Sequence, residues 1–256
     1  MPQAAGQILT LIRFELGRAF MRKQSLLYLS AFAFLWYFLI RYAVLNFAAM
    51  GGDSSSGLVW ANAALSTYFK IALYVFCLLS MLACANQTCG DRVRGTLRFL
   101  TLRCSRLTIF SARFLSQWAV FALLILACSS ALFIVITLNI GFEFEVFWQS
   151  ALYSLVLIIG VLPFIALMAV LSVLIDSARK VSVAAVFIWA LAASIIAGLS
   201  HYVPVLSVLE YLVPGFQFER LLALQGLDLL MLSYVPMIQA VVLLLAGAWL
   251  MKRQAL

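Results

Sequence analysis

Charged residues are scarce in this sequence. Only 10% of its 256 residues are Asp, Glu, Lys or Arg, whereas a typical soluble domain has about 25%. Hydrophobic residues make up 66% of the chain, and this balance excludes an ordinary soluble domain and predicts an integral membrane protein. The net charge of +8 would indicate a nucleic-acid partner in a soluble protein, but cytoplasmic loops of membrane proteins also collect Lys and Arg. We therefore expect membrane lipid, and no nucleic acid, around this chain.

Motifs for catalysis and for nucleotide binding are missing as well. The sequence contains no GxxxxGK[ST] for phosphates, no HExxH for zinc and no GxSxG for a nucleophilic serine. Its one histidine, His201, lies in a segment that we expect on the outer side of the membrane. The five cysteines form no CxxC and have no histidine nearby, so packing is a better interpretation than metal binding. We expect no enzyme, no metal site and no cofactor in this chain.

Long hydrophobic segments dominate what is present. Six of them reach the ~20 residues that an α-helix needs to cross the hydrocarbon core of a bilayer. They lie at residues 26–48, 63–88, 108–139, 148–174, 181–200 and 231–251. The fourth contains Gly160 and Pro163, which predict a kink. The expected fold class is an all-α integral membrane protein, with six transmembrane helices in a single domain over residues 1–256.

Two further segments lie outside these spans. Residues 3–25 place apolar and charged side chains on different sides of a helix, which predicts a surface helix and no cleavable signal peptide. Residues 201–230 are too polar for another crossing of the membrane. They predict one or two short interfacial or re-entrant helices, joined at Pro214-Gly215.

The distribution of charge predicts the orientation of the spans. If both termini are cytoplasmic, 14 of the 17 Lys and Arg residues lie on the cytoplasmic side, and Arg41, Lys70 and Arg220 lie in the outer half. Six of the nine acidic residues then fall outside. The positive-inside rule therefore favours six spans with both termini in the cytoplasm.

A basic stretch at residues 89–113 lies between the second and third spans. It contains six arginines and a single acidic residue, Asp91. Apolar residues recur in it at spacings of three and four, which predicts an amphipathic helix at about 91–106. A short basic helix between two spans either rests on lipid headgroups or contacts a cytoplasmic partner, and the residues alone leave both open.

Taken together, these segments resemble the permease subunits of ABC-2 type exporters. The specific motif is Asp91-Arg92-Val93-Arg94-Gly95-Thr96-Leu97, with Leu100 and Ser105-Arg106 following it. It is similar to the cytoplasmic segment between the second and third spans of that family. The segment 3–25, with Phe14-Glu15-Leu16, resembles the family's elbow helix, and 212–216 resembles its outer re-entrant region. Asp91 stands where the family commonly has Glu, and Cys104 replaces a frequent proline.

The resemblance implies a separate P-loop ATPase subunit, which would bind ATP and Mg²⁺ and dock on the cytoplasmic surface. The residues implied in coupling to it are Asp91, Arg92, Arg94, Gly95, Thr96, Leu97, Arg98, Leu100, Ser105 and Arg106. The implied elbow-helix residues are Phe14, Glu15 and Arg18. Because six spans are half the usual complement of such an exporter, the resemblance also implies a second permease, identical or related. An inner bacterial membrane fits the family.

The implied cargo is amphipathic or lipid-like, because the apolar spans of two permeases would line its route. Arg41, Lys70 and Tyr68 are candidate residues of that route. Arg41 can snorkel to lipid headgroups, and for Lys70 snorkelling is a better explanation than contact with a substrate. An aromatic residue such as Tyr68 is more commonly a packing residue.

Two alternatives to an exporter stay open. The first is a non-transporting assembly component or sensor, whose basic helix binds anionic lipid. Its binding to anionic liposomes would depend strongly on salt, whereas a coupling helix would bind an ATPase. The second is an intramembrane enzyme, for which the sequence offers no catalytic constellation.

Overall fold

The structure is a computed structural model, and every element in its described residues is helical. Four continuous ranges are described, 54–95, 104–202, 213–224 and 226–253. Ten isolated positions are described as well: Thr10, Arg13, Gly17, Ser30, Ala33, Phe34, Trp36, Tyr37, Arg41 and Tyr211. The prediction of an all-α fold is confirmed over these residues.

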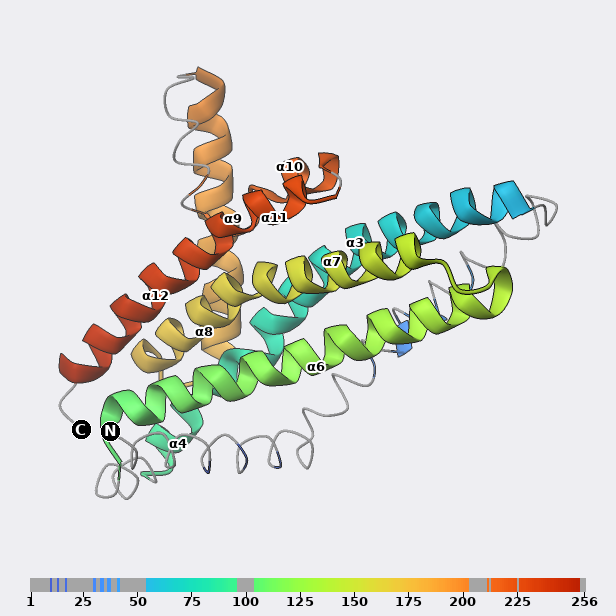
Figure 1. Cartoon of the computed structure of the whole chain (residues 1–256). Coiled ribbons are helices and arrows are strands. Elements are labelled where there is room, and N and C mark those ends of the chain that lie inside the picture. The colour runs from blue at the N-terminus through green and yellow to red at the C-terminus, as the bar shows by residue number, and fades with distance from the viewer. Residues whose placement is uncertain are drawn as a thin grey trace.

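Figure 1 shows the order of the helices along the chain. The first continuously described helix, α3 (Ser54–Ala83), continues through the 3-10 turn η1 (Cys84–Asn86) into the short α4 (Cys89–Val93). The next elements are α6 (Arg106–Ile140), α7 (Phe144–Gly160), α8 (Leu162–Leu174) and α9 (Ala178–Tyr202). The chain ends in α10 (Phe218–Ala223), α11 (Asp228–Leu232) and α12 (Tyr234–Arg253).

Among the residues that the structure describes, five helical segments are long and apolar enough to cross a membrane. They are Gly57–Asp91, Arg106–Ile140, Phe144–Leu174, Ala178–Ile196 and Asp228–Arg253. They coincide with the last five of the six predicted spans, so the chain has the character of a multi-pass membrane protein. The predicted first span, 26–48, and the predicted elbow helix, 3–25 with Phe14, Glu15 and Arg18, lie outside the described residues except for isolated positions.

The helix of the fourth predicted span is interrupted where Gly160 and Pro163 predicted a kink. Helix α7 ends at Gly160 and α8 begins at Leu162, with Pro163 in the first turn of α8. Proline is tolerated there because the first backbone N–H groups of a helix have no partner within the helix.

Helices α3, α6, α7 and α8 pack against one another, and α12 packs along α8 (Figure 1). The largest fully buried side chains of this bundle include Tyr68 and Phe76 from α3, Phe121 from α6 and Phe164 from α8. A smaller cluster around Phe110 joins the start of α6 to α8 and to the last turn of α12.

Helix α9 differs from the bundle helices. It contacts α8, η1 and α3, but it runs across the bundle and its C-terminal half leaves it (Figure 1). Its exposed apolar side chains include Val183, Val186, Phe187, Ile188, Leu191 and Ile195. The length of its apolar segment predicted α9 as a span but carries no information on the angle at which α9 crosses its neighbours.

The described ends of the segment 91–106 differ from the single helix that we expected. Helix α4 ends at Val93, and Gly95 has a φ of 71°, a conformation that glycine adopts without strain and that commonly ends a helix. At the other end, Ser105 has an extended backbone and caps α6. Residues 96–103, with Thr96, Leu97, Arg98 and Leu100, lie outside the described residues.

Short helices occur in the region 201–230, as predicted. A turn at Val213–Gln217 leads into α10, and α11 follows shortly before α12. Gly215 allows this turn because its φ is 101°, a value that side chains other than glycine rarely adopt.

Candidate functional site

A buried ion pair joins α4 to α6. Arg113 Nη2 donates a hydrogen bond to Asp91 Oδ2. The side chain of Arg113 is 6% exposed and that of Asp91 is 11% exposed. Arg113 lies in the third turn of α6, so the pair ties the short α4 to the N-terminal part of a long apolar helix.

Little water reaches the ion pair, and one nitrogen of the Arg113 guanidinium lacks a hydrogen bond. Arg113 Nη1 is buried and has no hydrogen-bond partner among the described residues. Removing two charges from water costs several kcal/mol, and close pairing of the two charges offsets that cost. The carboxylate of Asp91 is therefore needed to keep Arg113 buried.

Two further hydrogen bonds position this corner of the bundle. The hydroxyls of Thr88 and Ser172 lie 3.0 Å apart and connect the chain before α4 to α8. The backbone N–H of Thr108 donates to Ser105 Oγ at 3.1 Å, which is an N-cap for α6. Ser105, which we predicted as a coupling residue, therefore fixes where α6 begins.

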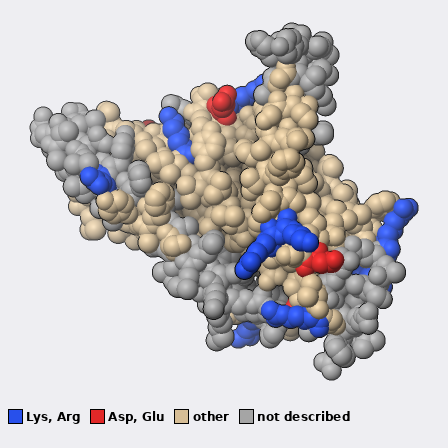
Figure 2. Space-filling model, turned by 180° about the vertical axis from the view of Figure 1, so that it is seen from behind, with Lys and Arg blue, Asp and Glu red and all other residues tan. Residues whose placement is uncertain are grey.

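Basic side chains surround the corner at one end of the bundle. Figure 1 places α4, the start of α6 and the end of α12 at this end, and Figure 2 shows Lys and Arg side chains gathered over its lower right. The described basic residues at these helix ends, which are exposed or partly exposed, are Arg94, Arg106, Lys252 and Arg253, and Arg179 and Lys180 are exposed at the start of α9. The guanidinium of Arg253 stacks over the Trp249 ring, 4.0 Å from its centroid.

The structure brings part of the predicted coupling set together. Asp91 is buried, Arg94 is exposed, Gly95 forms the turn, and Arg106 opens α6. The backbone of Arg92 belongs to α4, but its side chain is outside the described residues. Sequence reasoning missed the role of Arg113. An arginine two turns inside an apolar helix was the signal that could have identified a buried charge in need of a partner.

The three candidate route residues lie in different surroundings. Tyr68 is buried, and its hydroxyl lies 3.0 Å from Ser129 Oγ of α6, so it packs within the bundle. Lys70 is exposed on α3. Arg41 is exposed and donates a hydrogen bond of 2.9 Å to the Tyr37 hydroxyl.

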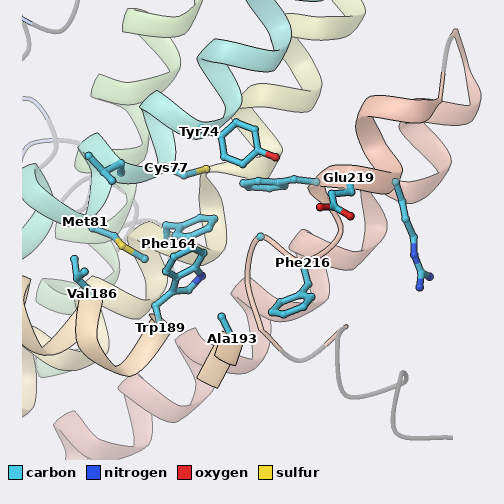
Figure 3. A pocket seen from close by; sticks show the side chains of 13 residues that line it. Tyr74, Cys77, Met81, Phe164, Val186, Trp189, Ala193, Phe216 and Glu219 are labelled. Carbon is cyan, nitrogen blue, oxygen red and sulfur yellow. The ribbon is translucent and has the colours of Figure 1, made fainter. Parts of the chain in front are cut away.

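A cavity of about 640 Å³ lies elsewhere, between α3, α8, α9 and the turn before α10 (Figure 3). Its wall is mostly aromatic and sulfur-containing: Tyr74, Cys77, Met81, Phe164, Trp189, Phe216 and Phe218. Its rim includes Glu219 and Arg220. None of Tyr68, Lys70 or Arg41 lines it. Sequence reasoning did not find this cavity because its wall combines four segments that are far apart in the chain.

The turn beside the cavity is held by polar contacts from two helices. Trp189 Nε1 of α9 donates to the carbonyl of Pro214 at 2.6 Å. Gln239 Nε2 of α12 donates to the carbonyl of Tyr211 at 2.6 Å, and Gln239 Oε1 accepts from Gln217 Nε2 at 3.3 Å. Two of these bonds satisfy backbone carbonyls, those of Pro214 and Tyr211, and the third joins two side chains. Together they fix the position of the turn.

A scan against known protein families found no family that matches the chain, and a search of curated proteins found no matching protein. Within the part of the chain that the structure describes, no three His, Cys, Asp or Glu side chains are close enough to hold a metal ion. The functional proposal below is therefore based on the motif at residues 91–106 and on the contacts in the structure.

Proposed function

We propose that this chain is the membrane-spanning permease subunit of an ATP-driven exporter of the ABC-2 type. The observation that carries the proposal is the buried ion pair between Asp91 and Arg113. It connects the segment that resembles the family's coupling motif to Arg106–Ile140, a helix long enough to cross a membrane. A displacement of α4 would therefore also displace α6, which is long enough to cross a membrane.

The chain would take its energy from a partner, because it contains no phosphate-binding motif of its own. A P-loop ATPase with ATP and Mg²⁺ would dock on the basic end, near residues 91–106. Closure of the ATPase would displace α4, and the paired Arg113 would carry that displacement into α6. A second permease, identical or related, would complete the route for an amphipathic or lipid-like cargo.

The proposal places the basic end of the bundle in the cytoplasm. The ends of α4, α6 and α12 meet there (Figure 1), and Lys252 and Arg253 lie in the last turn of α12. Positive charge is retained on the cytoplasmic side of membrane proteins. Both termini would then be cytoplasmic, in an inner bacterial membrane.

The same basic end also supports the second candidate function, a non-transporting component that binds anionic lipid. The exposed Arg94, Arg179 and Lys180 suit a negatively charged membrane surface as well as an acidic protein surface. Binding to lipid would not require the ion pair between Asp91 and Arg113, since neither side chain is presented at the surface.

Purification of the tagged full chain in mild detergent, with mass spectrometry of the proteins that accompany it, tests the proposal. We expect a P-loop ATPase in the wild-type sample and its loss when residues 96–103 are scrambled. Lys252→Gln with Arg253→Gln is the matched control, because it removes two basic charges at the same end and should retain the ATPase.

Recovery of the chain alone in several detergents, with salt-dependent binding to anionic liposomes, would overturn the exporter proposal in favour of the lipid-binding component. Insertion of each variant in the membrane is checked first, so that loss of the ATPase reports on docking.

A further inference from the structure

The cavity beside α10 carries one negatively charged group at its rim. Glu219 is exposed, and its carboxylate has no hydrogen-bond or ion-pair partner among the described residues. The neighbouring Arg220 also lines the cavity, but its guanidinium is engaged by Tyr211: it donates to the Tyr211 hydroxyl and lies 5.1 Å from the centroid of that ring. Tyr211 is not part of the cavity wall.

The residue that precedes Glu219 packs beside the middle of a membrane-length helix. The preceding residue, Phe218, is buried and contacts Tyr74 and Phe164, with ring centroids 5.7 Å and 6.0 Å apart. Tyr74 is the midpoint of the segment Gly57–Asp91. A carboxylate near the middle of a bilayer is costly unless a cation or water accompanies it, and such residues commonly belong to binding sites or pathways.

The nearest basic residue on α3 does not neutralise this carboxylate. Lys70 lies one turn before Tyr74, and it neither lines the cavity nor forms an ion pair with Glu219 in the described part of the chain. The position is thus open to a cation from outside the chain.

The wall of the cavity suits an organic cation. Figure 3 shows Tyr74, Phe164, Trp189 and Phe216 around the space, with the Glu219 side chain at its edge. Aromatic ring faces attract cations, and apolar side chains solvate the hydrocarbon groups that such a cation carries. The volume of about 640 Å³ falls within the range of roughly 300–1,000 Å³ that small-molecule sites have.

We propose that this cavity binds a lipophilic organic cation, such as a quaternary ammonium or phosphonium compound, with Glu219 as the counter-ion and the aromatic wall around its apolar groups. The ligand enters from the hydrophobic surroundings, because Tyr74, Leu78 and Val186 of the wall are exposed. The site does not depend on an ATPase partner. If the chain is an exporter permease, lipophilic cations belong to the class of its cargo.

Binding of tritiated tetraphenylphosphonium to the full chain tests this site. The protein is reconstituted in nanodiscs of phosphatidylcholine, and partition into empty nanodiscs is subtracted. The comparison ligand is tetraphenylborate, an anion of nearly the same size and shape. The variant is Glu219→Gln, and the matched control is Glu145→Gln, which removes the same charge from an exposed position at the start of α7.

We expect saturable binding of the cation, with tetraphenylborate at least about tenfold weaker. Glu219→Gln should weaken binding of the cation about tenfold, the effect of about 1.4 kcal/mol, whereas Glu145→Gln should leave it unchanged. Lys70→Gln should leave it unchanged or strengthen it.

Equal affinity for the two ions would overturn the proposal, as would absence of saturable binding of the cation. An equal effect of Glu219→Gln and Glu145→Gln would overturn the role of Glu219. The comparison of the two ions needs no variant, so it stands even if Glu219→Gln folds poorly. Failure here leaves the exporter proposal intact, because no ATPase takes part in the measurement.

Discussion

Two acidic side chains in this protein have opposite surroundings. Asp91 is buried and pairs with Arg113, whereas Glu219 is exposed at the rim of an apolar cavity and has no partner among the described residues. Both carry the same chemical group, and both lie in short helices that lead toward a long one. The difference indicates that the charge of Asp91 is used within the chain to hold two helices together. The charge of Glu219 is left for something outside the chain.

The comparison also separates mechanical from ligand-binding roles. A buried pair resists the separation of its partners, because an isolated charge would remain in an apolar interior. An exposed carboxylate without a partner adds little to the stability of the chain, so its contribution is measured as ligand affinity. Substitutions at the two positions should therefore differ in what they change.

The largest effect is expected for Asp91→Asn. Loss of the carboxylate leaves Arg113 buried without a counter-ion, which costs about 3–5 kcal/mol. For a chain of this length the corresponding fall in Tm is about 10 °C. Thermal unfolding of the detergent-solubilised protein, followed by size-exclusion chromatography, measures it.

A double variant isolates the cause of that loss. Asp91→Leu together with Arg113→Met removes both charges and should recover most of the Tm, since an apolar pair of similar volume needs no counter-ion. Glu145→Gln, an exposed position, is the control. If the double variant were no more stable than Asp91→Asn, the ion pair would not be the source of the stability.

An intermediate effect is expected for Trp189→Phe. The substitution keeps an aromatic ring in the cavity wall but removes the N–H that donates to the Pro214 carbonyl. An unpaired, partly buried carbonyl costs about 1–3 kcal/mol, so Tm should fall by a few °C. Affinity for tetraphenylphosphonium should fall as well, because the turn that leads to Glu219 becomes less well positioned.

Trp249→Phe serves as the matched control for this change. Trp249 is 52% exposed and stacks with Arg253 near the C-terminal end of α12. It does not line the cavity. It should leave both Tm and cation affinity nearly unchanged. Equal behaviour of the two tryptophan variants would show that the bond to Pro214 does not position the turn.

The helices themselves were largely predictable from the sequence. Apolar stretches of sufficient length located five of the spans, and the glycine and proline at 160 and 163 located the break between α7 and α8. The dipeptide Pro214-Gly215 located the turn before α10. These features depend on local composition and on backbone conformation, which a sequence contains directly.

The contacts between helices were not predictable in the same way. Arg113 meets Asp91 across 22 positions of sequence, and the motif was read as one helix although Gly95 turns the chain after α4. The cavity and the position of Glu219 depend on how the turn packs against α3, α8 and α9. Hydrophobic periodicity gives the buried face of each helix but not the helix that covers it.

The smallest effect on stability is expected for Glu219→Gln. Because Glu219 is exposed and unpaired in the described structure, the change should alter the free energy of unfolding by no more than about 0.5 kcal/mol.

The ranking of Glu219→Gln and Asp91→Asn should reverse in the binding experiment, where Glu219→Gln loses about tenfold in cation affinity. Asp91→Asn, measured at a temperature at which it remains folded, should retain wild-type affinity, since Asp91 does not line the cavity. Measuring Tm and tetraphenylphosphonium affinity on the same preparations gives both orders at once. If Glu219→Gln lowered Tm as much as Asp91→Asn does, Glu219 would have a structural partner, and the two acids would serve the same purpose.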